Sequence, residues 1–326
     1  MKVNANFNNS VKIEGYVYST GSNFNQLSER VTGEASKSPG TKYIAGDLEI
    51  ATDEQGLNVV TIHYSYVTEK YKSGSPNRTY NALKEIIDNP DKTWLVSGKE
   101  NALKVSCTGV SIGVNDFIAA DGSKVAAVRN ENGFCNIVSA LNEVEEDRST
   151  FSVDMLITKV TRKEADPEKG IKDEYVSVSG CVFSYGPKIV PISLVIRDTG
   201  GMKYFENLDV SSSNPVFTKI WGKVTNNIQK VERREESAFG EAAVYTFEKK
   251  TKEYLITGTS RIPYDFGDSE ILTAEDVVKL SQERQVLLAE VEERFKERQA
   301  IKANGTNDFS PGKDGKLEIP TGDFIF

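Results

Sequence analysis

The chain has 326 residues, a net charge of −8 and 38% hydrophobic residues, which allows two domains of ordinary size with packed cores. Its opening residues, MKVNANFNNS, lack the apolar segment of a signal peptide, and no run of about 18 apolar residues occurs. Cys107, Cys135 and Cys181 are widely spaced and form no CxxC motif, which favours buried free thiols in a reducing compartment. We therefore expect a cytoplasmic protein without membrane association.

The acidic charge is unevenly distributed along the chain. Between Tyr264 and Phe326 there are 14 acidic and 8 basic residues, a balance of −6. The preceding residues therefore carry −8 + 6 = −2. A nearly neutral body can hold a basic groove if its charges are segregated on the surface.

Alternating apolar and polar residues predict a first β-rich domain over residues 1–147. A long polar loop at 19–42 follows the first strand, and a turn at 53–56 separates the two strands of a hairpin. Apolar residues at helical spacing predict a short helix at 77–88, which Pro90 ends. The expected strands are 11–18, 43–51, 57–68, 94–96, 103–112 and 125–141.

Residues 148–266 repeat this order of elements and predict a second domain. A charged loop at 162–172 precedes a hairpin, a short helical piece is expected at 202–208, and 232–236 are expected to form a solvated loop. The expected strands are 151–158, 175–183, 189–196, 217–224, 242–247 and 254–259. Five strands with a helix between the third and the fourth are the plan of an OB-fold. The sequence thus predicts a mainly β protein with two tandem OB-like β-barrels.

After the barrels, residues 267–303 predict one amphipathic α-helix. Thr273 and Asp276 have the spacing of a capping box, and apolar residues then recur to Phe295. We expect the helix to pack on a barrel. A coiled-coil homo-oligomer is the alternative, although Arg284 interrupts the apolar stripe. Residues 304–326, rich in Gly, Asp and Asn, predict a disordered acidic C-terminal tail.

The chain ends Gly-Asp-Phe-Ile-Phe, with three large apolar residues after an acid. This ending resembles the C-terminal tip of phage and bacterial single-stranded-DNA-binding proteins. The resemblance implies a phage-encoded OB body that binds single-stranded DNA in the host cytoplasm. It also implies that the partner-binding residues Asp323, Phe324, Ile325 and Phe326 recruit replication, recombination or repair proteins. The alternative is that residues 324–326 fold back as an edge strand or plug.

Single strands are bound by stacking bases on aromatic rings and by following phosphates with lysine and arginine. The best candidate segment is 70–78, which mixes basic residues, a tyrosine and flexible backbone without an acid. The candidate nucleic-acid-binding residues are Tyr16, Tyr18, Lys37, Lys42, Tyr64, Tyr66, Lys70, Tyr71, Lys72, Arg78, Tyr185, Lys188, Lys203, Tyr204, Trp221 and Lys223.

The sequence offers little for catalysis, so we expect no enzyme activity, no catalytic residue, no metal and no cofactor. His63 is the single histidine and lies in a strand pattern without a nucleophile motif. Asp47 and Glu49 share a strand face and could hold Mg²⁺, but such acidic pairs are common. We predict single-stranded DNA binding and protection in replication or recombination. A phage structural or assembly protein is the first alternative, and a metal-dependent nuclease is the second.

Overall fold

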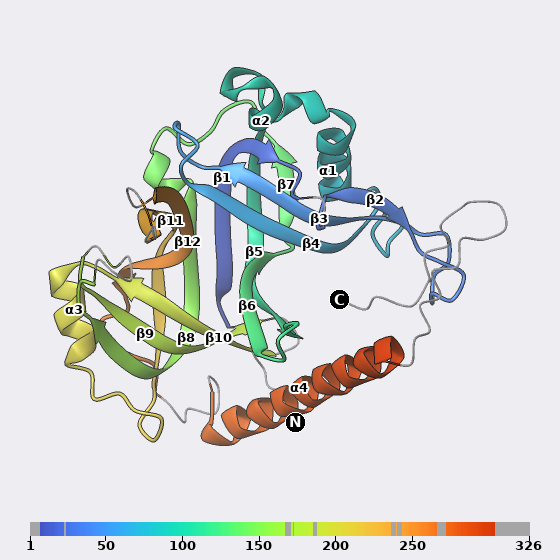
Figure 1. Cartoon of the computed structure of the whole chain (residues 1–326). Helices are drawn as coiled ribbons and strands as arrows, with labels where there is room; N and C mark the ends of the chain where they lie inside the picture. Colours follow the sequence, from blue (N-terminus) through green and yellow to red (C-terminus); the bar gives the residue numbers. More distant parts are fainter. Residues whose placement is uncertain are drawn as a thin grey trace.

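The computed structural model describes residues 7–22, 24–166, 171, 173–184, 188–235, 239, 243–265 and 272–303. Within these ranges, twelve strands form one large mixed sheet with helices at its margins (Figure 1). The chain is therefore mainly β, as predicted. The remaining residues, which include Tyr185 and the tail with its tip at 323–326, lie outside the described residues.

The first half of the chain forms one circuit of paired strands. Pairing runs from β1 through β3, β4, β6 and β5 back to β1, and the β4–β6 pair is parallel. Short strands β2 and β7 extend it by pairing with β3 and β5. Its strands are β1 (Asn9–Ser19), β2 (Ser28–Val31), β3 (Lys42–Ala51), β4 (Val59–Thr68), β5 (Lys104–Ile118), β6 (Lys124–Glu131) and β7 (Phe134–Ile137). Its helices are α1 (Arg78–Asp88), η1 (Pro90–Lys92), α2 (Trp94–Ser97) and η2 (Lys99–Asn101).

The second half repeats the circuit. Pairing runs from β8 through β9, β10, β12 and β11 back to β8, and the β10–β12 pair is parallel. Its elements are η3 (Glu145–Asp147), β8 (Ser149–Lys163), β9 (Tyr175–Ser184), β10 (Lys188–Ile196), α3 (Thr199–Glu206), β11 (Val216–Glu235) and β12 (Ala243–Thr259). We call these halves the first and the second unit.

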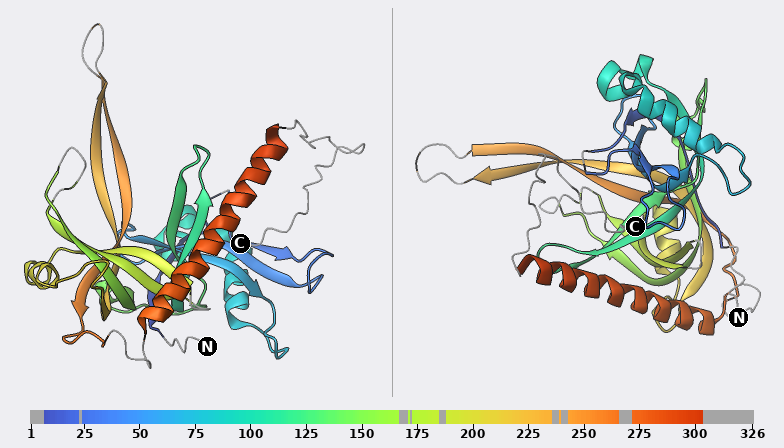
Figure 2. Two further views of the ribbon diagram at one scale, coloured as in Figure 1. Left: turned by 90° about the horizontal axis from the view of Figure 1, so that it is seen from below. Right: turned by 90° about the vertical axis from the view of Figure 1, so that its right-hand side faces the viewer.

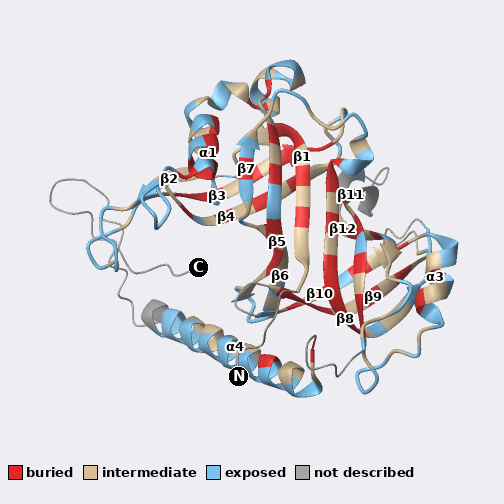
Figure 3. Ribbon diagram, turned by 180° about the vertical axis from the view of Figure 1, so that it is seen from behind, coloured by how far each residue is buried: buried red, intermediate tan, exposed pale blue. Residues whose placement is uncertain are grey.

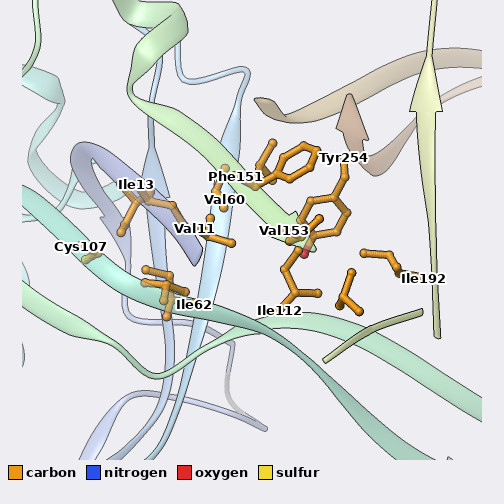
Figure 4. Packing of buried hydrophobic residues seen from close by; sticks show 14 of the residues in the cluster. Val11, Ile13, Val60, Ile62, Cys107, Ile112, Phe151, Val153, Ile192 and Tyr254 are labelled. Carbon is orange, nitrogen blue, oxygen red and sulfur yellow. The ribbon is translucent and has the colours of Figure 1, made fainter. Parts of the chain in front are cut away.

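The two units share a sheet and a hydrophobic core. Strand β1 pairs antiparallel with β8, so the sheet continues from one unit into the other. Buried side chains of both units pack in one cluster, in which the Phe151 and Tyr254 rings meet edge to face at 5.6 Å (Figure 4). The Tyr254 hydroxyl donates to Asn130 Oδ1 at 2.8 Å, which satisfies a polar group in the middle of this core. The units are therefore held in a fixed relative orientation.

Several segments differ from the prediction. The expected strand at 125–141 is divided into β6 and β7, the expected strands at 242–247 and 254–259 are one strand, β12, and the loop at 19–42 contains β2. The expected strand at 94–96 is instead the one-turn helix α2, because Gly98, at a positive φ of 79°, donates from its backbone N–H to the Trp94 carbonyl. The expected loop at 232–236 belongs, as far as Glu235, to strand β11. Strands β11 and β12 form a long hairpin that projects from the body (Figure 2). A run of charged residues argues against a strand that must bury one face. A two-stranded ribbon that projects from the body need not bury either face, so charged residues can form it.

The predicted amphipathic helix is α4 (Ala274–Ala303), which runs past the ends of β5 and β10. Thr273 forms the capping interaction: its hydroxyl donates to the Asp276 carboxylate at 2.7 Å and accepts from the Asp276 N–H at 3.1 Å. Leu280 is buried against the second unit, whereas Val286 and Leu287 are 60% and 41% exposed. Most of α4 is coloured exposed or intermediate in Figure 3. Leu280 is therefore the most deeply packed residue of the apolar stripe, and Leu288, Val291 and Phe295 are only partly buried. Among the described helices, none is both long and apolar enough to span a membrane.

Arg284 fixes α4 to both units. Its guanidinium donates to both carboxylate oxygens of Asp116 on β5, at 2.7 and 3.0 Å, and to the Ile189 carbonyl on β10, at 3.2 Å. From the sequence, this arginine is expected to interrupt the apolar stripe of the helix. In the structure it anchors the helix together with Leu280 and the Lys124–Glu292 ion pair, because a guanidinium fork can satisfy a carboxylate and a carbonyl at once.

Lys252 gives the fold a pH-dependent stability. Its ammonium lies 4.9 Å from the centroid of the buried Tyr254 ring, and burial lowers the pKa of Lys252 from 10.5 to about 8. Between these two pKa values the unfolded chain binds more protons, so stability rises with pH across this range. Below a pH of about 8 the buried charge destabilises the fold by a constant amount.

We predict that Lys252→Met stabilises the protein by on the order of 1–3 kcal/mol near pH 7 and abolishes the rise of stability above a pH of about 8. Urea unfolding at several pH values measures both effects. A variant that is no more stable than the wild type near neutral pH, and that keeps the rise, contradicts the prediction.

Candidate nucleic-acid interface

A pair of tyrosine rings marks the outer surface of the first unit. The rings of Tyr43 on β3 and Tyr66 on β4 lie 4.6 Å apart between centroids, with planes inclined by 41°. Tyr66 is 50% exposed. Arg30 is the cross-strand neighbour of Tyr43 on β2 and is also exposed. Two adjacent aromatic rings beside a guanidinium offer a surface on which bases can stack.

The position of this pair depends on an irregularity in strand pairing. Between β3 and β4, Ile44 pairs with Val67 but Gly46 pairs with Tyr64, so β4 has one residue more than β3 here. Gly46 has a φ of 129°, and a Cβ at this position would lie 2.5 Å from the Gln26 carbonyl oxygen. Glycine at this position therefore lets the loop before β2 lie against the sheet.

The loop that follows β4 presents basic side chains next to this strand. Lys70, Tyr71 and Lys72 are exposed, and the Tyr71 N–H donates to the Ser75 carbonyl at 2.9 Å. Asn77 anchors the loop: its side chain donates to the Thr68 carbonyl at 2.9 Å and accepts from the Thr79 N–H at 3.1 Å as the N-cap of α1. The loop is thus ordered by its own hydrogen bonds while its cations face solvent. We call Arg30, Tyr43, Tyr66, Lys70, Tyr71 and Lys72 the aromatic patch.

Two of the predicted nucleic-acid-binding residues of the first unit are buried and so cannot contact a base. Tyr16 is buried against the Trp94 ring, and its hydroxyl donates to Glu54 at 3.2 Å. Tyr64 is fully buried, and burial holds its pKa well above the ordinary value. Strand alternation would put Tyr64 and Tyr66 on one face, but the extra residue in β4 places Tyr64 in the core and Tyr66 in solvent.

The other predicted residues of the first unit are spread around the aromatic patch. Tyr18 is half-buried beside Trp94, and Lys37 is exposed in the loop before β3. Lys42 is exposed and lies 4.0 Å from the Glu29 carboxylate. Arg78 is exposed at the start of α1. Lys42 alternates with Tyr43 along β3, and its partner Glu29 also binds Tyr80 of α1, so Lys42 faces α1 and not the side of Tyr43.

The predicted residues of the second unit do not gather at one place. Lys188 begins β10, Lys203 and Tyr204 lie on α3, and Trp221 and Lys223 lie on β11. Trp221 is 40% exposed, with its indole over Gly258. In the part of the chain that the structure describes, no hydrogen bond, ion pair or ring contact connects Lys188, the α3 residues and the β11 residues with one another.

The Asp47–Glu49 pair occupies the same strand as Tyr43 but has protein partners. Asp47 Oδ1 lies 2.7 Å from His63 Nδ1, and Glu49 accepts from the Ser19 hydroxyl at 2.5 Å. Within the described ranges, no group of three or more His, Cys, Asp and Glu side chains is arranged to hold a metal ion. These acids place negative charge at the end of β3 that lies away from Tyr43.

The sequence predicted Tyr66 and the loop lysines but missed Tyr43 and Arg30. Both lie in strand pairs whose partners are far apart in sequence, so their proximity to Tyr66 depends on register. The sequence does place an arginine at position 30 and a tyrosine at position 43, at the two ends of one loop. These two residues alone do not determine how β2, β3 and β4 are aligned.

Comparison with protein families places this geometry in context. A family model described as YorF matches residues 8–294, which cover both units and most of α4. No curated protein matches the chain. The assignment to the single-stranded-DNA-binding protein family, which the tip at 323–326 suggested, is therefore wrong, because the family that matches is a different one.

We predict that Asn77→Ala lowers the free energy of unfolding by about 1–2 kcal/mol, because it removes an N-cap and leaves the Thr68 carbonyl without its donor. It also speeds amide hydrogen exchange in residues 69–76. Asn81→Ala, at an exposed position inside the same helix, serves as the control and should change stability by less than about 0.5 kcal/mol. Equal effects of the two substitutions contradict the anchoring role of Asn77.

Proposed function

The chain belongs to the YorF family, and we propose that this member is a non-catalytic protein that binds and protects single-stranded DNA in replication or recombination. The proposal rests on the geometry of the chain and not on family membership. The observation that carries it is the aromatic patch, which combines the tilted ring pair Tyr43–Tyr66, the cross-strand neighbour Arg30 and the ordered basic loop that follows β4.

The strand order supports this proposal. We propose that each circuit of five strands is an OB-like barrel. Counted along the circuit members in chain order, the third strand pairs parallel with the fifth: β4 with β6 in the first unit and β10 with β12 in the second. A helix lies between the third and the fourth strand in both units. OB-folds bind oligonucleotides on the face of their second and third strands and on the adjoining loops. In the first unit these strands are β3 and β4, which carry Tyr43 and Tyr66.

Physical chemistry indicates how the patch would act. Every base has a π-face, so stacking on Tyr66 and Tyr71 tolerates any sequence and contributes about 1–3 kcal/mol per base. Arg30, Lys70 and Lys72 would neutralise phosphates and release counterions. Binding should therefore be largely independent of sequence and strongly dependent on salt.

The tip at 323–326 keeps a place in the proposal as the segment that recruits replication or recombination proteins, because its large apolar side chains suit capture in a pocket of a partner. An assembly protein is the second candidate. The exposed Val286 and Leu287 on α4 and the projecting β11–β12 hairpin are features through which such a protein would bind its neighbours.

Titration of a fluorescent oligo-dT with the full chain tests the proposal. We expect binding at about 50 mM salt that weakens steeply by about 300 mM. Tyr66→Ala should reduce affinity by about tenfold or more, because a stacking platform worth about 1–3 kcal/mol is lost, and Tyr66→Phe should retain it.

Tyr245→Ala is the matched control, because Tyr245 is 54% exposed on the β11–β12 hairpin, away from the aromatic patch. It should bind like the wild type. Absence of binding at low salt would overturn the proposed function and favour the assembly protein.

A further inference from the structure

The outer face of β8, β9 and β10 in the second unit carries a residue pattern that the sequence did not reveal. Along β9, Val176 and Val178 are fully buried in the core, so the alternate residues Tyr175, Ser177 and Ser179 point outwards. Strand register places their neighbours on the same face. The whole set is Lys159, Thr161, Lys163, Tyr175, Ser177, Ser179, Ser193, Val195 and Arg197. We call it the serine face.

Helix α4 covers only the other half of this surface. Further along β9 the outward residues become Cys181 and Phe183, which are buried in a cluster with Leu280 of α4. Where the helix no longer covers the strands, the outward residues change to serines, and Ser193 is exposed. The change in composition thus coincides with the end of the cover, as expected for a surface adapted to water or to a polar ligand.

The charged residues of β8 are divided between its two faces. Lys159 and Lys163 are exposed, and in the part of the chain that the structure describes neither has a carboxylate within 4.0 Å. The neighbouring acids Glu174 and Glu206 instead bind Arg162, at 2.9 and 2.8 Å. Because Arg162 is the cross-strand partner of the buried Val176, these acids gather on the opposite side from the serine face.

An oriented aromatic ring completes the serine face. The Arg197 guanidinium lies 5.0 Å from the centroid of the Tyr175 ring, and its Nη2 donates to both oxygens of Glu253 at 2.9 and 3.1 Å. The carboxylate thus holds the guanidinium over the ring of Tyr175. Ser179 and Ser193 form a hydroxyl pair at 2.8 Å between β9 and β10.

We propose that the serine face is a second binding site for single-stranded DNA, separate from the aromatic patch. In this site Lys159 and Lys163 neutralise phosphates, the serine hydroxyls donate to phosphate oxygens, and the Tyr175 ring stacks with one base. A stacking ring needs an unpaired base, so single strands are preferred to duplexes. The inference rests on the proposed function and extends it, because one strand would contact both units.

The test uses the full chain and oligo-dT of two lengths, about 10 and about 40 nucleotides, because only the longer strand can reach both sites. For Lys159→Ala/Lys163→Ala we expect about tenfold weaker binding of the longer strand. We also expect a salt dependence smaller by about 1.4 in log–log slope, from two lost phosphate contacts. Lys92→Ala/Lys296→Ala removes the same charge elsewhere and should match the wild type.

A second measurement is independent of any substitution in the lysines. Photocrosslinking of wild-type protein to bromouracil-containing single strands should modify the peptide that contains Tyr175. Failure of the wild type to bind any single strand overturns the proposed function itself. A different outcome overturns only the serine-face site. In that outcome Tyr66→Ala weakens binding, no crosslink forms at Tyr175, and the Lys159/Lys163 and Lys92/Lys296 double substitutions have equal effects on binding.

Discussion

The antiparallel pairing of β1 with β8 is the constraint on which the rest of this structure depends. It joins two circuits of strands edge to edge and lets one hydrophobic core run through both. Asn130 and Tyr254 satisfy each other inside that core, where an unpaired polar group would be strongly destabilising. The outer faces of the two units therefore keep a fixed relative geometry. A polymer that contacted both units would bind without an entropic cost for aligning one unit with the other.

Burial decides which aromatic residues can take part in recognition. Tyr16, Tyr64 and Tyr254 support the interior, whereas Tyr66 and Tyr71 remain accessible. The acidic residues are also unevenly distributed over the surfaces of the two units. Asp47 and Glu49 occupy one end of the face of β3, and the acids around Arg162 lie behind the serine face. The chain is acidic in total, yet exposed cations lie in the loop after β4 and along β8.

Much of the architecture could be predicted from alternation and capping. The strands near 11–18, 43–51, 175–183 and 189–196, the helix that starts after Asn77 and the capped helix after Thr273 all appear in the structure. What could not be predicted depends on register. One extra residue in β4 separates Tyr64 from Tyr66, and the face that contains Lys159, Tyr175 and Ser193 exists only once three strands are aligned. Single-sequence periodicity shows that a residue faces outwards but not which distant residue lies beside it.

Arg284 gives this arrangement an evolutionary consequence. One guanidinium meets a carboxylate from the first unit and a backbone carbonyl from the second, so the position of α4 is set jointly by both. Lysine, a compact point charge without a fork, cannot reproduce that geometry. Loss of either Arg284 or Asp116 would leave the other charge without this partner, so we expect the two positions to change together in evolution. Leu280 and the Lys124–Glu292 pair would still hold the helix against the strands.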